Sequence, residues 1–374
     1  MKKRMVKGIA VCMSVMMGMT GCGGNTKKET ATLKAETDVV PAKNDNVDFF
    51  PKSYSEQIGK VNFDCALEIP ENFDALNFHM PKVNGYSFMD NEKIYQTYVE
   101  GKEIKEEYHN SEDAAADYEN AGDFYILSDD TEIGITGTLH YYRSAVTAYW
   151  NASREDENGA PKDTFHFGSA EDCISDLKSR LIEVGCPVEQ YQFDWFSTSG
   201  EEHASLESQL VETQMLDSQK RKQDGWSEAD DSYDIYAWQM YEALPVFPLL
   251  LTQSKRYIGD TYKKAPLGAV YTAQGALSIS LTYPPFAFEK TNEIVPFLSF
   301  EDIADVVVQK YEELLEDEDI VHTVMSAKLF LRTYYDESQR IEAEPVWYFQ
   351  VSDGTNTEPL LIQAISGEEI PLIN

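Results

Sequence analysis

The sequence predicts an α+β protein in which two related helix-plus-antiparallel-sheet modules follow an N-terminal α+β domain. Two observations support this prediction. The string Ser169-Ala-Glu-Asp172 recurs as Ser299-Phe-Glu-Asp302, and each copy opens an amphipathic run. Each run is followed by an aromatic strand pattern and then by a turn glycine, so that the order of elements repeats along the chain.

The first 21 residues have the features of a secretory signal peptide. Four basic residues precede an apolar stretch from Gly8 to Met19, whose 12 residues are too few to span a bilayer. The stretch ends in Met19-Thr20-Gly21-Cys22, which resembles the bacterial lipobox, with methionine where leucine is usual. The resemblance implies that Cys22 carries lipid, such as palmitate, and anchors the protein on the extracytoplasmic face of the cell membrane. The alternative is an ordinary signal peptide followed by a chance cysteine.

Residues 22–46 are polar and nearly free of large apolar side chains, which predicts a disordered tether. Beyond residue 21 the chain has 27 Lys and Arg against 65 Asp and Glu. Such an acidic surface argues against nucleic-acid partners and against flat binding to anionic lipid, because both need basic surface. It also keeps a tethered domain soluble.

Residues 47–150 are predicted to form the N-terminal α+β domain. Alternating apolar residues and closing prolines or turn residues indicate strands, while acidic residues near a capping position indicate short helices. The strands are expected at 61–69, 76–80, 124–127 and 133–145, and the helices at 92–98 and 111–118.

The first helix-sheet module is expected at 160–290. Ser169 and Asp172 form a helix start, because a serine hydroxyl accepts a hydrogen bond from a free backbone N–H. The helix presents Cys173, Leu177, Leu181 and Val184 on one face and ends at Gly185-Cys-Pro187. The strand 190–196 follows, and a polar insertion is expected at 200–230.

The second module is expected at 291–374, with Phe300, Ile303, Val307 and Leu314 on the apolar face of its helix. Two further pairs of similar strings support a duplication. They are 242–247 with 342–347, which contain Pro245 and Pro345, and 268–275 with 360–367, which end in glycine. We therefore expect the strands that hold Pro245 and Pro345 to occupy equivalent places.

The closing stretch consists of the aromatic strand Pro345-Val-Trp-Tyr-Phe-Gln-Val351, a Gly/Asn turn and the segment 362–370. It resembles a PepSY-like module. The doubled arrangement, which covers about 165–374, is similar to extracytoplasmic regulators of a cell-wall histidine kinase. It is closer to uncharacterised cell-surface lipoproteins of clostridia and related Gram-positive bacteria. The resemblance implies an envelope protein that binds or regulates a partner, and it transfers no catalytic residue.

Three cysteines besides Cys12 and Cys22 need an assignment. Cys173 and Cys186 flank one helix, whose rise places them roughly 20 Å apart, beyond the ~7 Å limit for a disulfide. We expect no bond between them, and a bridge from Cys65 to either stays open. No Cys/His spacing typical of zinc occurs, so that neither a metal nor a cofactor is expected.

No catalytic motif surrounds the histidines, and the acidic clusters lack calcium-loop spacing, so solvated turns are the preferred interpretation. The aromatic residues Trp195, Trp238 and Trp347 and the tyrosines at 233–241 have two interpretations. They pack the sheets against the helices, or they form an exposed groove for a peptide or glycan. The histidines are His79, His109, His140, His166, His203 and His322, and the acidic clusters are Asp129-Asp130-Glu132, Asp230-Asp231 and Glu316 to Asp319.

The leading functional hypothesis is a non-catalytic, membrane-anchored binding or regulatory lipoprotein, whose partner is an envelope protein or peptide. We expect no enzymatic activity. One alternative is a wall-acting hydrolase that uses a carboxylate pair, since any acid-rich chain offers pairs. The other is a solute-binding lipoprotein, which the missing strand-helix alternation of two-lobed binding proteins disfavours.

Overall fold

The computed structural model describes residues 49–110, 121–152, 161, 163–248, 265–314 and 320–372. The signal peptide, Cys22 and the tether 22–46 lie outside the described residues, as do the helix expected at 111–118 and the acids Glu316 to Asp319. Residues 48–374 form one compact unit. The predicted fold class, α+β with helix-plus-antiparallel-sheet modules, is confirmed.

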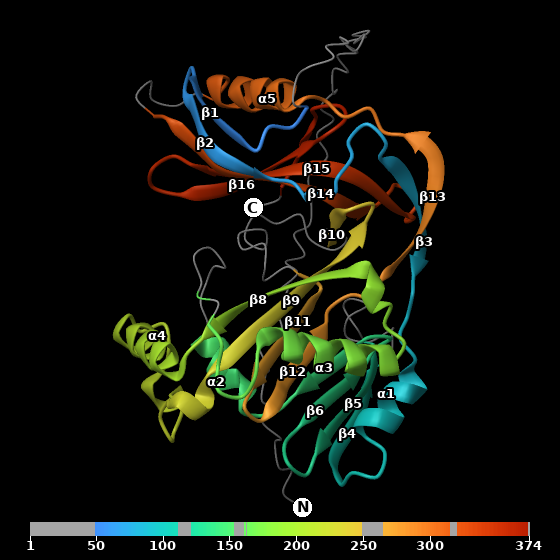
Figure 1. The fold of residues 1–374 in the computed structure, drawn as a ribbon, viewed down its shortest axis with the longest axis vertical. Coiled ribbons are helices and arrows are strands. Elements are labelled where there is room, and N and C mark those ends of the chain that lie inside the picture. The colour runs from blue at the N-terminus through green and yellow to red at the C-terminus, as the bar shows by residue number, and fades with distance from the viewer. Residues whose placement is uncertain are drawn as a thin grey trace, which may run out of the picture. The chain divides into compact units, whose positions relative to one another are not determined.

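The first module consists of α3 (Ala170–Glu183) packed across one face of an antiparallel sheet (Figure 1). Ser169 and Asp172 form the predicted capping box, in which the Ser169 side chain accepts from the Asp172 backbone N–H and the Asp172 carboxylate accepts from the Ser169 backbone N–H. Leu177 and Leu181 are fully buried against the sheet, as the spacing of four residues predicts. The four strands are, in spatial order, β8 (Tyr191–Thr198), β9 (Ser232–Tyr241), β11 (Leu267–Thr272) and β12 (Gly275–Leu281).

The second module repeats this order with α5 (Phe300–Glu312) over its own strands (Figure 1). Ser299 caps the helix by accepting from the Asp302 backbone N–H. Leu314, predicted on the apolar helix face, lies beyond the end of α5 and is 36% exposed. The antiparallel strands are, in spatial order, β14 (His322–Tyr335), β15 (Ile341–Ser352), β16 (Thr357–Gln363) and β17 (Glu369–Ile370).

The equivalence predicted for Pro245 and Pro345 is wrong. By strand order β15, which contains Pro345, corresponds to β9, whereas Pro245 lies on β10 (Leu244–Pro248). Pro345 faces Leu331 within the β14–β15 ladder, and Pro245 faces Met240 in a hairpin. Both strings contribute residues to apolar strands, and local similarity does not specify a strand's partners. The glycine pair does correspond, since Gly275 and Gly367 both have positive φ in the turns that precede β12 and β17.

Residues 47–150 contribute strands beside both modules. β1 (Ser53–Ile58) pairs with β2 (Val61–Glu68), and β2 lies parallel to β14 in the second module. A ladder of four antiparallel strands instead extends the first module's sheet from β12. Its strands are β7 (Leu139–Tyr142), β6 (Glu132–Ile135), β5 (Gly122–Leu127) and β4 (Ile104–Asn110).

The remaining elements pack on or beside these sheets. The predicted polar insertion forms the β8–β9 connection and contains α4 (Gly200–Glu212), which begins in a second capping box at Ser199. β3 (His79–Tyr86) and β13 (Phe286–Ile294) form a separate antiparallel pair. The other helices are α1 (Asn91–Tyr98), which confirms the helix expected at 92–98, and α2 (Val146–Asn151).

The two modules' sheets are joined through β10. Glu242 and Ala243, which both have positive φ, form the turn between β9 and β10. The later residues of β10 then pair in parallel with β14. Positive φ is unfavourable for residues other than glycine. The Glu242 carboxylate offsets this cost, because it accepts from the His79 backbone N–H at 2.7 Å and pairs with Lys290.

Leu177→Ala tests the packing of α3 on its sheet. We expect it to lower the free energy of unfolding by about 2–5 kcal/mol, because it leaves a cavity beneath the helix. The matched control is Ile182→Ala on the same helix, whose side chain is 59% exposed and whose loss should change stability by no more than about 0.5 kcal/mol. Equal effects in chemical denaturation would contradict this packing.

Candidate functional site

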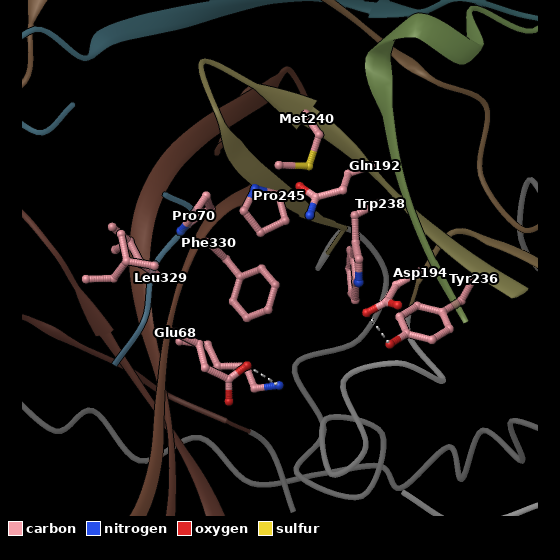
Figure 2. Close-up of a pocket in the computed structure, with 12 residues that line it drawn as sticks. Glu68, Pro70, Gln192, Asp194, Tyr236, Trp238, Met240, Pro245, Leu329 and Phe330 are labelled. Atoms are coloured by element: carbon pink, nitrogen blue, oxygen red, sulfur yellow. Dashed lines mark hydrogen bonds and ion pairs between the residues drawn. The ribbon is translucent and has the colours of Figure 1, made fainter. Parts of the chain in front are cut away.

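The candidate site is a pocket where strands of both modules meet, named here the junction pocket (Figure 2). Its volume is about 270 Å³. It is lined by Glu68 at the end of β2 and Ile69 and Pro70 after it, by Gln192 and Asp194 of β8, by Tyr236, Trp238 and Met240 of β9, by Pro245 of β10 and by Lys328, Leu329 and Phe330 of β14.

The pocket exists because β2 and β10 share one edge of β14. The parallel pairing of β2 ends at Glu68 opposite Lys328, and that of β10 begins at Val246 opposite Leu331. Leu329 and Phe330 lie between these two segments and have register partners only on β15. Pro70 and Pro245 flank this interruption and have no N–H with which to continue a ladder.

Aromatic rings form one wall of the junction pocket. The Trp238 and Phe330 ring centroids are 5.5 Å apart, and both rings also contact Phe247. Figure 2 shows the two rings next to one another in the pocket lining. Phe247 and Phe330 are buried and Trp238 is half-buried, so that Trp238 offers the accessible part of a wall that stabilises an apolar or planar group removed from water.

Polar side chains form the opposite rim. The Lys328 Nζ lies 2.9 Å from the Glu68 Oε2, and the Tyr236 hydroxyl donates to the Asp194 Oδ2 at 3.2 Å (Figure 2). Glu68, Gln192 and Asp194 are exposed at the rim. The pocket therefore combines an apolar wall with acidic and amide groups, which suits a ligand that has both an apolar and a basic or hydrogen-bonding part.

The aromatic residues divide between the buried core and the pocket lining, while binding of a peptide or glycan stays a prediction. Along β9 the side chains alternate between the sheet's faces, so that Tyr233 packs beneath α3 while Tyr236 and Trp238 line the junction pocket. Trp347 is fully buried beneath α5. Burial could not be predicted from composition, but the period of two along 232–241 is the signal that separates the two groups.

The six histidines are dispersed, and none lines the junction pocket. His79 and His140 lie on strands, as predicted. His203 is fully buried, where its ring stacks on Trp226 and hydrogen-bonds the Ala152 carbonyl and the Ser232 hydroxyl. His109 lies on β4 beside Asp123. His166 packs against Phe167, and His322 stacks on Tyr311.

Cys65, Cys173 and Cys186 are free and buried, and burial raises the pKa of each thiol, to about 11 for Cys65 and Cys173. The described part of the chain contains no group of three or more His, Cys, Asp or Glu side chains arranged to hold a metal ion. In the same described ranges, no helix has the length and apolar character needed to cross a membrane.

The predicted acidic turns act in local structure. The Asp129 carboxylate accepts from the Thr131 backbone N–H, and the Asp353 carboxylate accepts from those of Thr355 and Asn356 in the turn that contains Gly354. Asp231 is instead buried and accepts from the Gly200 backbone N–H at the start of α4. These acids therefore shape turns and a helix start.

Comparisons with known proteins bear on the fold. No protein-family model matches the chain, and no curated protein matches it. An uncharacterised protein from Eubacterium rectale ATCC 33656 has a similar structure, with a TM-score of 0.55 and 14% identity over 86% of this chain and 94% of that chain. This likeness shows a shared fold alone.

The C-terminal domain of Bacillus megaterium YpeB also aligns, with 11% identity over 76% of this chain and 96% of that chain. The TM-score of this alignment is 0.31, which is too low to support an inference about ligand or role. The junction pocket therefore has to be interpreted from its own residues.

The burial of His203 predicts a pH effect on stability. Desolvation lowers its pKa to about 4, so that between pH ~6.5 and ~4 the unfolded chain binds more protons than the folded one. Stability then falls as the pH decreases through this window, by up to roughly 3 kcal/mol from this residue. Subtracting the unfolding free energies of His203→Gln from those of the wild type should isolate this slope, and a flat difference would contradict the assignment.

Proposed function

We propose that this protein is a cell-surface lipoprotein that holds an extracytoplasmic peptide, or a segment of an envelope protein, in the junction pocket without catalysing a reaction. The observation that carries the proposal is the interrupted edge of β14 beside an aromatic wall. Peptides commonly bind where strand edges and side-chain pockets lie together, because backbone hydrogen bonds give affinity and the pockets give specificity.

The residues of the pocket suggest how such a segment binds. An apolar or aromatic side chain would lie against the wall that Trp238 and Phe330 form together, since their ring centroids are 5.5 Å apart and the rings are in contact. The carboxylates of Glu68 and Asp194 at the rim would favour a basic neighbouring residue, and Gln192 adds an amide that both donates and accepts. The net charge of −34 extends this preference, because it attracts basic segments over a longer range.

Trp238→Ala tests binding in this pocket. Fluorescently labelled pentapeptides that place Lys or Arg beside Phe, Leu or Ala should bind the wild-type protein in anisotropy titrations. Removal of the central aromatic anchor should weaken this binding at least about tenfold. Tyr108→Ala is the matched control, since Tyr108 is a 52% exposed aromatic residue outside the pocket, and it should leave the affinity unchanged.

The same preparation distinguishes binding from hydrolysis. Incubation with the peptides and with purified peptidoglycan should yield no cleavage product by mass spectrometry. Turnover that disappears in Glu68→Gln or Asp194→Asn would contradict the binding proposal and support the carboxylate-pair hydrolase. Equal affinity of Trp238→Ala and the wild type would remove the junction pocket as the binding site.

The proposed anchor is Cys22, which lies outside the described residues. Two acyl chains give durable membrane attachment, whereas one chain gives only marginal binding. Cys22→Ala should therefore release the protein into the medium or leave the signal peptide unprocessed, as measured by fractionation and intact-mass analysis. A wild-type protein without lipid on Cys22 would contradict the anchoring, while the pocket measurements would still stand on their own.

A further inference from the structure

A second pocket lies on the face of the first module's sheet that points away from α3. It has a volume of about 350 Å³ and is named here the Asp234 pocket. Four aromatic rings and three polar side chains define it. These are Tyr142, Trp150, Phe196 and Tyr236, with Asp234, Ser278 and Ser280.

Asp234 occupies the centre of the sheet. It lies on β9 between Phe196 of β8 and Val270 of β11, and its side chain is partly accessible. Among the described residues its carboxylate has no hydrogen-bond or ion-pair partner, unlike Asp194, which accepts from the Tyr236 hydroxyl. Desolvation raises the pKa of the Asp234 carboxyl to about 7.

The neighbouring polar groups are already engaged with one another. The Tyr142 hydroxyl donates to the Ser280 Oγ at 2.8 Å, and the His140 Nδ1 lies 3.1 Å from the same oxygen. The Ser278 hydroxyl oxygen accepts a hydrogen bond from the Val270 backbone N–H at 3.2 Å. Among the described residues Asp234 is thus left as an unpaired acid in a partly accessible pocket, and its desolvation costs folding free energy that a cation could offset.

Two pairs of rings share the lining of this pocket with the Asp234 carboxylate. Trp150 of α2 packs edge-on against Tyr142 with centroids 5.2 Å apart, and Phe196 and Tyr236 form a second pair at 6.4 Å. Aromatic faces attract organic cations within about 6 Å of the ring centroid, most strongly where water is excluded. A carboxylate that lines the same pocket as such rings has the chemistry that recognises an ammonium group.

We propose that the Asp234 pocket binds an organic ammonium group, with Asp234 as its counter-ion and the rings of Tyr142, Trp150, Phe196 and Tyr236 around it. The ligand class is an alkylamine or a quaternary ammonium compound. This site is distinct from the junction pocket, although Tyr236 lines both.

The pH dependence follows from the groups that face Asp234. Tyr142 and His140 approach from β7 and Tyr236 from β9, and the described lining residues of β8, β11 and β12 include no further titratable group. Burial lowers the pKa of His140 to about 4 and raises that of Tyr142 above its ordinary value, so both remain neutral near pH 7. Asp234 is therefore the group that ionises, and ammonium binding should strengthen as the pH rises from 6 to 8.

The test uses n-butylammonium and tetramethylammonium as probes, with n-butanol as the neutral analogue of the first. Protein-observed NMR titrations of the whole protein should show both cations binding at this site and n-butanol binding at least tenfold more weakly. Asp234→Asn should weaken both cations at least tenfold, and Trp150→Ala should weaken tetramethylammonium. Asp64→Asn, at an exposed position of β2 outside both pockets, is the matched control and should change neither.

A measurement on the wild type keeps the proposal testable if Asp234→Asn does not fold. The ¹³C resonance of the Asp234 carboxyl should titrate near pH 7 in the free protein and at lower pH with tetramethylammonium present. An unchanged titration, equal binding of n-butanol and n-butylammonium, or undiminished binding to folded Asp234→Asn would each overturn the proposal. Loss of peptide binding in Trp238→Ala would not bear on the ammonium proposal, because that variant tests the junction pocket.

Discussion

The arrangement of this protein depends on one strand edge that two segments share. β14 pairs with β15 along one edge, and its other edge is divided between β2 and β10. The first of these segments comes from the beginning of the described chain and the second from the hairpin that follows β9. Since both depend on the same backbone groups of β14, this edge connects the N-terminal strands, the first module and the second module.

The junction pocket is a consequence of that division. A strand that passed continuously along β14 would cover Leu329 and Phe330, whereas two strands that end and begin there leave a space. The prolines at 70 and 245 make continuation unfavourable, because neither can donate to the ladder. The unusual positive φ values of Glu242 and Ala243 turn the chain so that β10 reaches β14, and the contacts of Glu242 with His79 and Lys290 stabilise this turn.

One strand, β9, serves the core and both pockets. Its alternate side chains pack beneath α3, and the others, Asp234, Tyr236 and Trp238, line the two pockets in turn. Asp234 and Trp238 are four residues apart, which corresponds to about 13 Å along an extended strand. Both proposed ligands carry positive charge, in keeping with the excess of acidic residues in the chain, and a basic ligand could approach either pocket through the same long-range field.

The sequence by itself determined the elements whose signals are local. Ser169 and Ser299 begin helices because a hydroxyl and an acid three residues later satisfy free N–H groups, and Leu177 and Leu181 are buried because their spacing matches the helical repeat. Alternation along β9 likewise divides its side chains between two faces. The tertiary structure alone decided which strands pair. Pro245 and Pro345 have similar neighbours in sequence but different partners, and Glu68 meets Lys328 across most of the chain. The junction pocket follows from those long-range pairings, because its lining residues come together only when β2, β8, β9, β10 and β14 are paired. The Asp234 pocket likewise requires the pairing of β7, β8, β9, β11 and β12. No local pattern specifies a contact between segments so far apart.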